Sequence, residues 1–226
     1  MRLRIFLRNL YLRQVRILGN YVTVDKTSSG EYSEKRSRFI ATLYPCKNER
    51  EAARILADHR SKYWDAKHNV YAYILKDNTA KFSDDGEPHS TAGKPVYDCL
   101  NHSGIVDAMI IVTRYFGGVL LGTGGLVRAY SAASKAAIEN ASLVSMANCD
   151  IFEVIIPYSD QGKIMSFLRD NECDITDTEF GENVKITFAT GTENGETVLN
   201  GLKEISGDRL APLKTGTKIL PVSIKK

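Results

Sequence analysis

The sequence predicts an α+β protein with two domains. Its 226 residues are enough for one large domain or two modest ones. The first part of the chain is centred on an apolar strand, a glycine-rich turn and an alanine-rich helix. The later part follows the order β-α-β-β-α-β, which is typical of a ferredoxin-like split βαβ domain. We therefore expect a basic N-terminal extension at 1–20, a first domain at 21–145 and a ferredoxin-like domain at 146–226.

The composition is that of a soluble globular protein, with 43% hydrophobic and 25% charged residues. No apolar run reaches the length of a membrane-spanning helix. The four cysteines form no CxxC pair, and the four histidines show neither HxxxH nor HExxH spacing. We therefore expect a cytoplasmic protein with free thiols, no membrane association, no metal site and no cofactor.

The formal net charge of +3 is unevenly distributed. Residues 1–20 carry five arginines and no acid, residues 21–148 carry 16 Lys/Arg against 14 Asp/Glu, and residues 149–226 carry 9 against 13. The body of the protein is therefore close to neutral, which argues against a generally basic nucleic-acid binder and against sequence-specific DNA binding. Any RNA contact would have to be local.

The basic extension at residues 1–20 has two interpretations. It is either an amphipathic basic helix that contacts RNA or a membrane surface, or a poorly ordered terminus, which we favour.

The elements of the first domain are predicted from side-chain alternation, turn residues and helical spacing. They are a strand at Tyr21–Asp25, a turn at Thr27–Gly30, a strand at Ser37–Pro45, a helix from Glu49 to about Tyr63 capped by Asn48, a strand at His68–Lys76, a helix towards Asn101, a strand at Asp107–Thr113 and a helix from about Gly125 to Asn140. His59 lies on the apolar face of the first of these helices, so we expect a core-edge residue rather than a ligand.

Between two of these elements lies an acidic loop, Phe82–Pro95. Asp84, Asp85 and Glu87 precede a proline in it, and Thr91 is placed to cap the following helix. Acids in a loop most often face water. They could also hold Mg²⁺, or pair with arginines across a cleft.

The chain is organised around Ile110–Tyr130, which we predict to form a strand, a glycine-rich turn and a helix N-terminus. Glycines permit close approach of the backbone to a ligand, and a helix N-terminus presents free N–H groups. The candidate anion-binding or nucleic-acid-binding residues are Arg114, Tyr115, Phe116, Gly117, Gly118, Gly122, Gly124, Gly125 and Arg128. Tight loop packing without any ligand is the alternative. The GxxxxGK[ST] and GxGxxG fingerprints of nucleotide sites are absent from this sequence.

The second domain is predicted from a new pattern after Ala141, with a boundary near Ser142–Asn148. Its elements are a strand at Cys149–Pro157, a helix at Tyr158–Asn171, a hairpin of Cys173–Phe180 and Asn183–Thr190 around Gly181-Glu182, a helix at Gly195–Ser206 and a strand within Asp208–Leu220. This part contains no recognisable catalytic constellation, and we assign no catalytic residue anywhere in the chain.

Four motifs resemble those of the IMPACT/YigZ family, in its bacterial two-domain form. They are SRFIA (Ser37–Ala41), HNVYAY (His68–Tyr73), DDGEP..TAGKP (Asp84–Pro95) and VTRYFGGVLLGTGGLVRAYS (Val112–Ser131). The resemblance implies a first domain like domain 2 of ribosomal protein S5. It implies a second domain like the ferredoxin-like C-terminal domain of elongation factor G.

The functional implications of this resemblance concern translation. Eukaryotic members regulate translation initiation by competing for an activator of a stress-responsive kinase of an initiation factor. They carry an N-terminal RWD domain that this sequence lacks, which puts that partner in doubt here. The pair His89-Ser90 also departs from the small pair that relatives tend to carry after DDGEP.

Three functions stay open from the sequence. The first is a non-enzymatic protein of the translation system that binds RNA or a ribosome-associated partner, with phosphate held by Arg114 and Arg128 and a base stacked on Tyr115 or Phe116. The second is an enzyme that acts on a phosphorylated small molecule or nucleotide with Mg²⁺ held by the acidic loop. The third is a protein-binding module in which Arg114 forms a buried ion pair with Asp85 or Glu87. The oligomeric state is not predicted.

Overall fold

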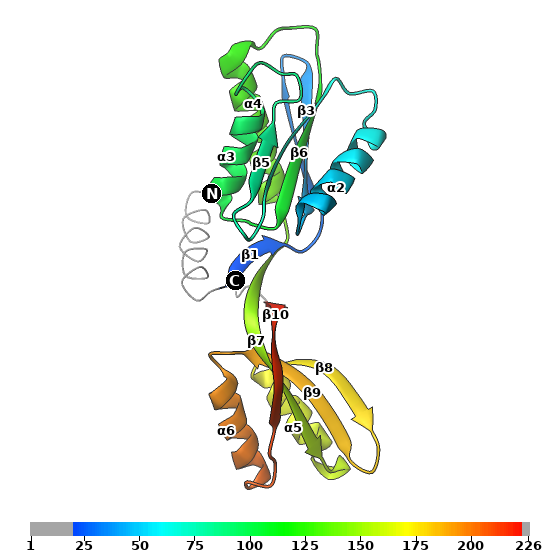
Figure 1. Ribbon diagram of the computed structural model, residues 1–226, viewed down its shortest axis with the longest axis vertical. Coiled ribbons are helices and arrows are strands. Elements are labelled where there is room, and N and C mark those ends of the chain that lie inside the picture. The colour runs from blue at the N-terminus through cyan, green and yellow to red at the C-terminus, as the bar shows by residue number, and fades with distance from the viewer. Residues whose placement is uncertain (1–19, 223–226) are drawn as a thin grey trace. The chain divides into compact units, whose positions relative to one another are not determined.

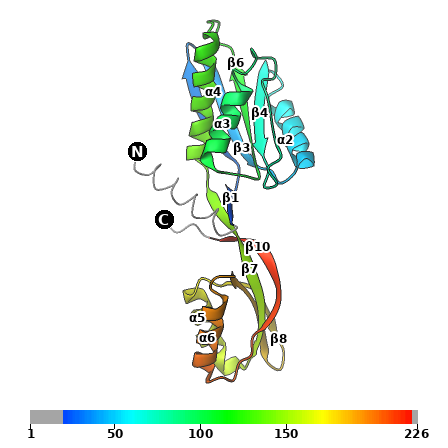
Figure 2. The same ribbon diagram turned by 60° about the vertical axis from the view of Figure 1, so that its left-hand side comes forward.

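The computed structural model describes residues 20–222, and Figures 1 and 2 show its ribbon from two directions. The expected extension therefore lies outside the described residues, apart from Asn20. The chain divides into two compact units, with Ser145 the last residue of the first and the second running from Met146 to Val222.

The first unit contains one five-stranded sheet with helices on both of its faces. Its elements are β1 (Tyr21–Val24), β2 (Ser28–Glu34), β3 (Ser37–Pro45), α2 (Glu49–Lys62), β4 (His68–Ile74), β5 (Ala80–Ser83), α3 (Gly93–Ser103), β6 (Ala108–Tyr115) and α4 (Gly122–Glu139). The sheet has the order β2-β3-β6-β4-β5, and its neighbouring strands are antiparallel. In Figure 2, α3 and α4 cover one face of this sheet and α2 covers the other.

The two faces of the sheet carry separate hydrophobic cores. Val70 and Ala72 of β4 pack into the core beneath α3 and α4, whereas Tyr73 and the following Leu75 pack into the core beneath α2. This split follows from the period of two along a strand, as the sequence predicts. The central strand β6 is buried along almost its whole length, because it is covered on both faces and both edges.

Two sequence predictions in this unit are wrong in an informative way. Thr27–Gly30 is not a turn, because β2 begins at Ser28. Gly30 lies in that strand for a packing reason, since a Cβ there would come within 2.3 Å of the backbone nitrogen of Ala137 in α4. The predicted loop at Phe82–Pro95 starts inside the short edge strand β5, whose residues Ala80–Ser83 show no strong alternation.

Helix α4 begins earlier than predicted. It starts at Gly122 rather than Gly125, so three of the five candidate glycines belong to its first turn. Glycine has low helix propensity, which explains why sequence reasoning placed the start later. The irregular stretch between β6 and α4 is correspondingly short.

The second unit is a split βαβ domain, as predicted. Its elements are β7 (Leu143–Ile156), the 3₁₀ turn η1 (Tyr158–Asp160), α5 (Gln161–Asp170), β8 (Asp174–Phe180), β9 (Val184–Gly191), α6 (Gly195–Ser206) and β10 (Leu213–Val222). The strands lie in the order β10-β7-β9-β8, and β1 also pairs with β7. The predicted boundary at Ser142–Asn148 is largely strand, because β7 begins in the first unit and continues into the second. The prediction of an α+β fold in two parts is confirmed.

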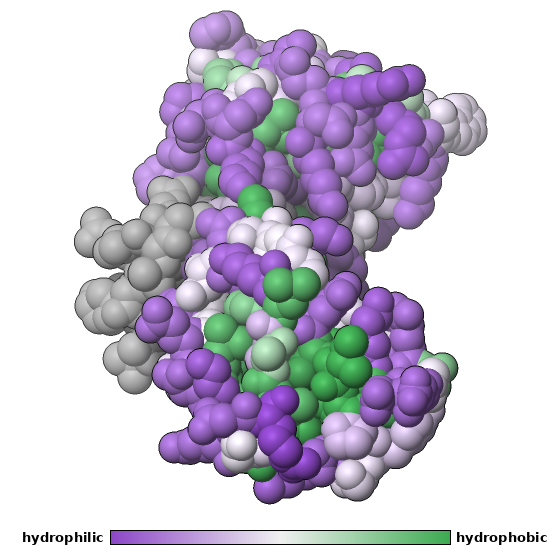
Figure 3. Space-filling model, turned by 60° about the horizontal axis from the view of Figure 1, so that its bottom comes forward, coloured by the Kyte–Doolittle hydropathy of each residue, from purple (hydrophilic) through white to green (hydrophobic). Residues whose placement is uncertain are grey.

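On the face of the molecule that Figure 3 draws, apolar surface gathers on the second unit. Large exposed apolar side chains occur in both units, and those of the first include Trp64, Phe116 and Leu120. Large exposed apolar side chains of the second unit include Ile155, Phe180 and Leu213. Over the described residues, no helix combines the length and the apolar character that crossing a membrane requires.

Candidate functional site

The candidate site begins with one row of side chains across the sheet of the first unit. Arg114 on β6 lies opposite Phe39 on β3 and opposite His68 on β4. Directly paired residues project to the same face of a sheet, so these three side chains are neighbours. The row lies near the last residue of β6, where the chain leaves for the glycine segment (117–125).

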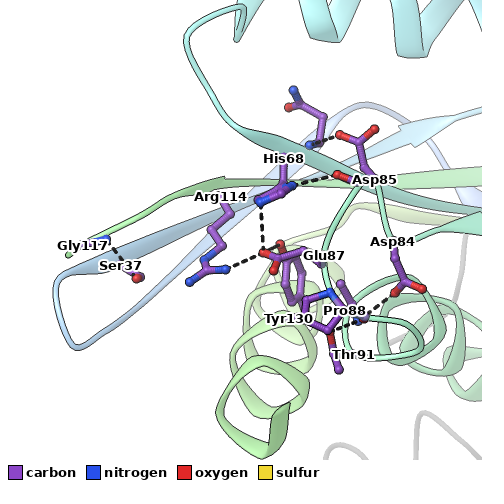
Figure 4. A network of polar contacts seen from close by, with 12 residues as sticks. Ser37, His68, Asp84, Asp85, Glu87, Pro88, Thr91, Arg114, Gly117 and Tyr130 are labelled. Atoms are coloured by element: carbon purple, nitrogen blue, oxygen red, sulfur yellow. Dashed lines mark hydrogen bonds and ion pairs between the residues drawn. The ribbon is translucent and has the colours of Figure 1, made fainter. Parts of the chain in front are cut away.

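A buried ion pair links Arg114 of this row to Glu87 of the acidic loop. Nη1 of Arg114 lies 2.6 Å from Oε1 of Glu87, and both side chains are less than 8% exposed. Tyr130 of α4 donates its hydroxyl hydrogen to the same oxygen at 2.7 Å. His68 Nε2 lies 3.9 Å from it. Figure 4 shows these side chains converging on Glu87.

The surroundings of Arg114 fix its position. Its guanidinium carbon lies 5.5 Å from the ring centroids of both Phe39 and Phe116, so cation–π contacts add to the ion pair. Its Nε is buried and makes no hydrogen bond within the described part of the chain. Burial raises the pKa of Tyr130, and the nearby Glu87 carboxylate raises it further. Tyr130 therefore stays protonated and acts as a donor.

Asp84 holds the start of α3. Its Oδ1 accepts from the backbone N–H of Ala92 at 3.0 Å and of Gly93 at 2.8 Å, and its Oδ2 accepts from that of Ser90 at 2.9 Å. The prediction that Thr91 caps this helix is wrong, because no side chain at the N-cap position bonds the first turn. Thr91 instead donates to the carbonyl of Pro88. The carboxylate of Asp84, rather than the hydroxyl of Thr91, therefore accepts hydrogen bonds from the N–H groups at the start of α3.

Asp85 ties the acidic loop to the rest of the unit. One carboxylate oxygen accepts from Arg60 of α2 and the other from the backbone N–H of Asn69, at 2.6 Å. Its carbonyl accepts from His68 Nδ1 at 2.7 Å. With Asp84 and Glu87, all three acids of the loop are thus engaged within the fold. Among residues 20–222 there is no group of three or more His, Cys, Asp or Glu side chains that could hold a metal ion.

A second polar chain continues on the other face of the sheet. Thr113 donates to the side chain of Asn69 at 2.8 Å, so its oxygen is free to accept from His59 Nε2 at 2.7 Å. The other ring nitrogen of His59 then accepts from the hydroxyl of Tyr44 at 2.8 Å. Burial lowers the pKa of His59 to about 4. His59 is thus a buried neutral residue, deeper than the core edge expected from the sequence.

Sequence reasoning did not single out His68 and Tyr130, the two residues that complete the polar cluster around Glu87. Both lie in motifs quoted above, HNVYAY and VRAYS, so a signal was present. Tyr130 also sits four residues after Leu126 on the buried face of α4, where its hydroxyl is far from solvent and needs a partner.

The glycine segment meets a tight turn between β2 and β3. A Cβ on Gly117 would lie 2.1 Å from the backbone carbon of Arg36, and the Gly117 N–H donates to Ser37 Oγ at 3.1 Å. Only glycine fits this approach. Gly118 and Gly122 have positive φ values of 82° and 71° and open space around them. Gly124 and Gly125 lie in the first turn of α4.

The structure does not bring Arg114 and Arg128 together as a pair of phosphate ligands. Arg114 is buried and neutralised, whereas the side chain of Arg128 is 71% exposed and lies 3.8 Å from Glu34. Of the aromatic candidates, Phe116 is exposed and Tyr115 is half-buried, with its hydroxyl donating to Asp65 at 2.9 Å. The surface available to a partner therefore excludes Arg114 and consists of the exposed residues of 116–128.

Two further cations lie at the same end of the unit. Lys35 and Arg36 form the basic turn, the two-residue connection between β2 and β3, and both are exposed. Their φ values are 46° and 64°. A turn with positive φ at both positions normally carries Asn-Gly or Asp-Gly. Residues other than Gly, Asn and Asp strain the backbone in this conformation.

Comparison with known proteins assigns both parts of the chain. Residues 35–138 match the family model described as the Impact N-terminal domain, and residues 154–209 match a domain of unknown function (DUF1949). A solved structure described as that of a hypothetical protein is similar with a TM-score of 0.57 and 26% identity, covering 87% of this chain and 98% of its own.

Curated relatives resemble the chain over most of its length. The IMPACT family member YvyE of Bacillus subtilis is 34% identical over 183 residues, which is 80% of this chain and 83% of that protein. An IMPACT family member of Thermus thermophilus is 34% identical over 178 residues, 78% of this chain and 97% of its own. Because these relatives are 34% identical and are matched over 83% and 97% of their own length, the chain belongs to the IMPACT family.

Proposed function

We propose that the protein acts in translation by binding RNA of ribosomal particles through the exposed end of its first unit. The proposed surface consists of the basic turn, Arg128 and the glycine segment. The family's link to translation supports the context. The geometry supports a binding role, since every acid of the adjacent loop is already engaged within the fold.

The observation that carries this proposal is the basic turn. Lys35 and Arg36 occupy backbone conformations that cost of order 1 kcal/mol each for such residues and that Asn-Gly would adopt without strain. Strained residues of this kind concentrate at functional sites. Both side chains are exposed and basic, so they are available to an anionic partner and contribute little to the packing of the fold.

The neighbouring groups suit phosphate. Arg128 lies beside the turn, as its approach to Glu34 shows. The first turn of α4 has no side-chain cap and no acidic residue, so its N–H groups face outwards with the positive end of the helix dipole. Phe116 is exposed at the start of the segment and offers a ring to a base.

The alternative enzyme acting on a phosphorylated molecule with Mg²⁺ is less well supported. Asp84 and Asp85, which would hold the metal, bond backbone N–H groups and Arg60. If these carboxylates bound a metal instead, the N–H groups at the start of α3 would lose their acceptor and the acidic loop would lose its bonds to Asn69 and Arg60. No observation in the described residues favours this second function over the first.

The test is sedimentation of the protein with ribosomal particles through sucrose gradients at low and high salt. The decisive variant is Lys35→Asn/Arg36→Gly, which removes two charges while installing the residues that this turn prefers. It should fold at least as stably as the wild type, yet lose salt-sensitive co-sedimentation. A wild-type protein that stays at the top of every gradient would contradict the proposal, as would a variant that co-sediments unchanged.

A further inference from the structure

The chain has one tryptophan, and it is not in either core. Trp64 follows the end of α2 and is 82% exposed. Burying a tryptophan stabilises a fold because it removes a large apolar area from water. Trp64 contributes little in this way, and its ring is accessible to a partner.

Trp64 lies next to the surface proposed above. Its neighbour Asp65 accepts a hydrogen bond at 2.9 Å from Tyr115, and the residue after Tyr115 is Phe116. Trp64 follows α2 and Phe116 follows β6, so each of these two exposed residues adjoins in sequence one partner of this hydrogen bond. Phe116 is 53% exposed. The hydrogen bond fixes the two chain segments against each other.

Exposed cations lie near each of these two aromatic residues. Lys62 and Lys67 are exposed on the same segment as Trp64, and Nζ of Lys62 lies 5.2 Å from the ring centroid of Tyr63. On the other side, the backbone of Gly117 touches the basic turn. Asp65, an acid beside Trp64, accepts the hydrogen bond of Tyr115. Exposed cations are therefore present both at the basic turn and at the end of α2.

We propose that this end of the first unit binds single-stranded RNA, with one base stacked on Trp64 and another on Phe116. The inference rests on the proposed function and specifies its partner. Lys62, Lys67 and the basic turn would contact the phosphates on either side of the stacked bases. Aromatic rings alternating with cations are the pattern by which proteins hold single strands without reading their sequence. A duplex hides the faces of its bases and cannot use these rings.

Because Trp64 is the one tryptophan, its fluorescence reports directly on stacking. The full-length protein is titrated with a 12-nucleotide oligouridylate, and the emission of Trp64 is recorded. In parallel, the anisotropy of a fluorescein-labelled copy of the same RNA reports binding independently of the tryptophan. We expect quenching and anisotropy to saturate together, and an unlabelled RNA duplex of the same length to compete poorly.

Three variants test whether a base stacks on Trp64. Trp64→Ala should weaken binding about fivefold to more than a hundredfold, the equivalent of the roughly 1–3 kcal/mol that one stacked base contributes. Trp64→Phe should recover most of the affinity. Phe180→Ala, which removes an exposed ring from the second unit, should leave binding unchanged. Since Trp64 is exposed, the melting temperature of its variants should match that of the wild type.

Two outcomes overturn the inference, and they are distinguishable. If the anisotropy shows binding but Trp64 is not quenched and Trp64→Ala binds normally, stacking is refuted while RNA binding through the basic turn stands. If no RNA binds, the inference and the proposed RNA-binding function both fail. Co-sedimentation with ribosomal particles that Lys35→Asn/Arg36→Gly abolishes would then indicate a protein partner at this surface.

Discussion

Nη1 of Arg114 and Oε1 of Glu87 lie 2.6 Å apart in a site that excludes solvent, and Tyr130 donates to the same carboxylate oxygen. Removing the cation alone would leave a buried carboxylate with a single neutral donor. We therefore expect Arg114→Ala to lower the free energy of unfolding by about 3–5 kcal/mol, as for other buried pairs broken on one side. Urea denaturation followed by circular dichroism measures this change.

The double variant Arg114→Met/Glu87→Met provides the control. It removes both charges and keeps the volume similar, so it should be markedly less destabilised than Arg114→Ala. A loss below about 1 kcal/mol in the single variant would instead mean that water reaches Glu87 once Arg114 is removed, and that the pair contributes little.

Asp84 and Thr91 differ in what they do for α3, although both were candidates in the acidic loop. Asp84 accepts from three backbone N–H groups, two of them at the start of the helix. We expect Asp84→Ala to cost at least the ~1–2 kcal/mol of a lost helix cap. Hydrogen exchange should show faster exchange of the Ala92 and Gly93 amides.

Thr91→Ala is the matched change in the same loop. It removes only the bond to the carbonyl of Pro88, so the amides of Ala92 and Gly93 should keep their protection. Equal acceleration in both variants would show that loop rigidity, not the carboxylate cap, protects the start of α3.

Gly117 and Gly124 test which glycines of the segment are needed for folding. A Cβ at Gly117 would meet the backbone of Arg36 at 2.1 Å, so Gly117→Ala must displace the basic turn and destabilise the protein. At Gly124 the nearest atom is a mobile Arg128 nitrogen at 3.8 Å, and alanine favours a helix. Gly124→Ala should therefore raise stability by roughly 0.5–1 kcal/mol.

Thermal denaturation of the two alanine variants, side by side, measures the contrast. RNA titration of Gly124→Ala adds information, because a ligand that approaches the backbone of the first turn closely would be repelled by the new methyl group. If both variants were equally destabilised, the packing explanation for Gly117 would be wrong.

Most of the fold could be predicted from local pattern. The strand Ser37–Pro45 and the helix Gly195–Ser206 were predicted at their observed bounds, because alternation and helical spacing are strong there. The errors arose where a contact distant in sequence overrides local preference. Gly30 looks like a turn residue but lies in a strand because α4 packs against it.

The candidate site was predictable in its residues but not in its partners. The sequence placed Arg114 and Arg128 together, whereas the register of β6 turns the first into the interior and the spacing along α4 leaves the second outside. The third hypothesis predicts an ion pair between Arg114 and Asp85 or Glu87, and the structure contains the pair with Glu87. The choice between these two acids depends on the conformation of the loop, which the local sequence does not determine.

His59 makes the stability of the first unit depend on pH in a defined window. Its pKa is lowered to about 4 by burial, against about 6.5 in an unfolded chain. Between pH 6.5 and 4 the imidazole of His59 is protonated in the unfolded chain but not in the folded protein. The free energy of unfolding therefore falls as pH is lowered, by up to about 3 kcal/mol.

His59→Gln tests this pH dependence, because glutamine cannot titrate but can still form a hydrogen bond with Thr113 or Tyr44. Its stability should therefore fall less steeply between pH 6.5 and 4 than that of the wild type, as measured by urea denaturation at several pH values. The other three histidines are common to both proteins and cancel in the comparison. Identical slopes would show that His59 is protonated in the folded protein, and that its hydrogen bonds to Thr113 and Tyr44 rearrange to allow it.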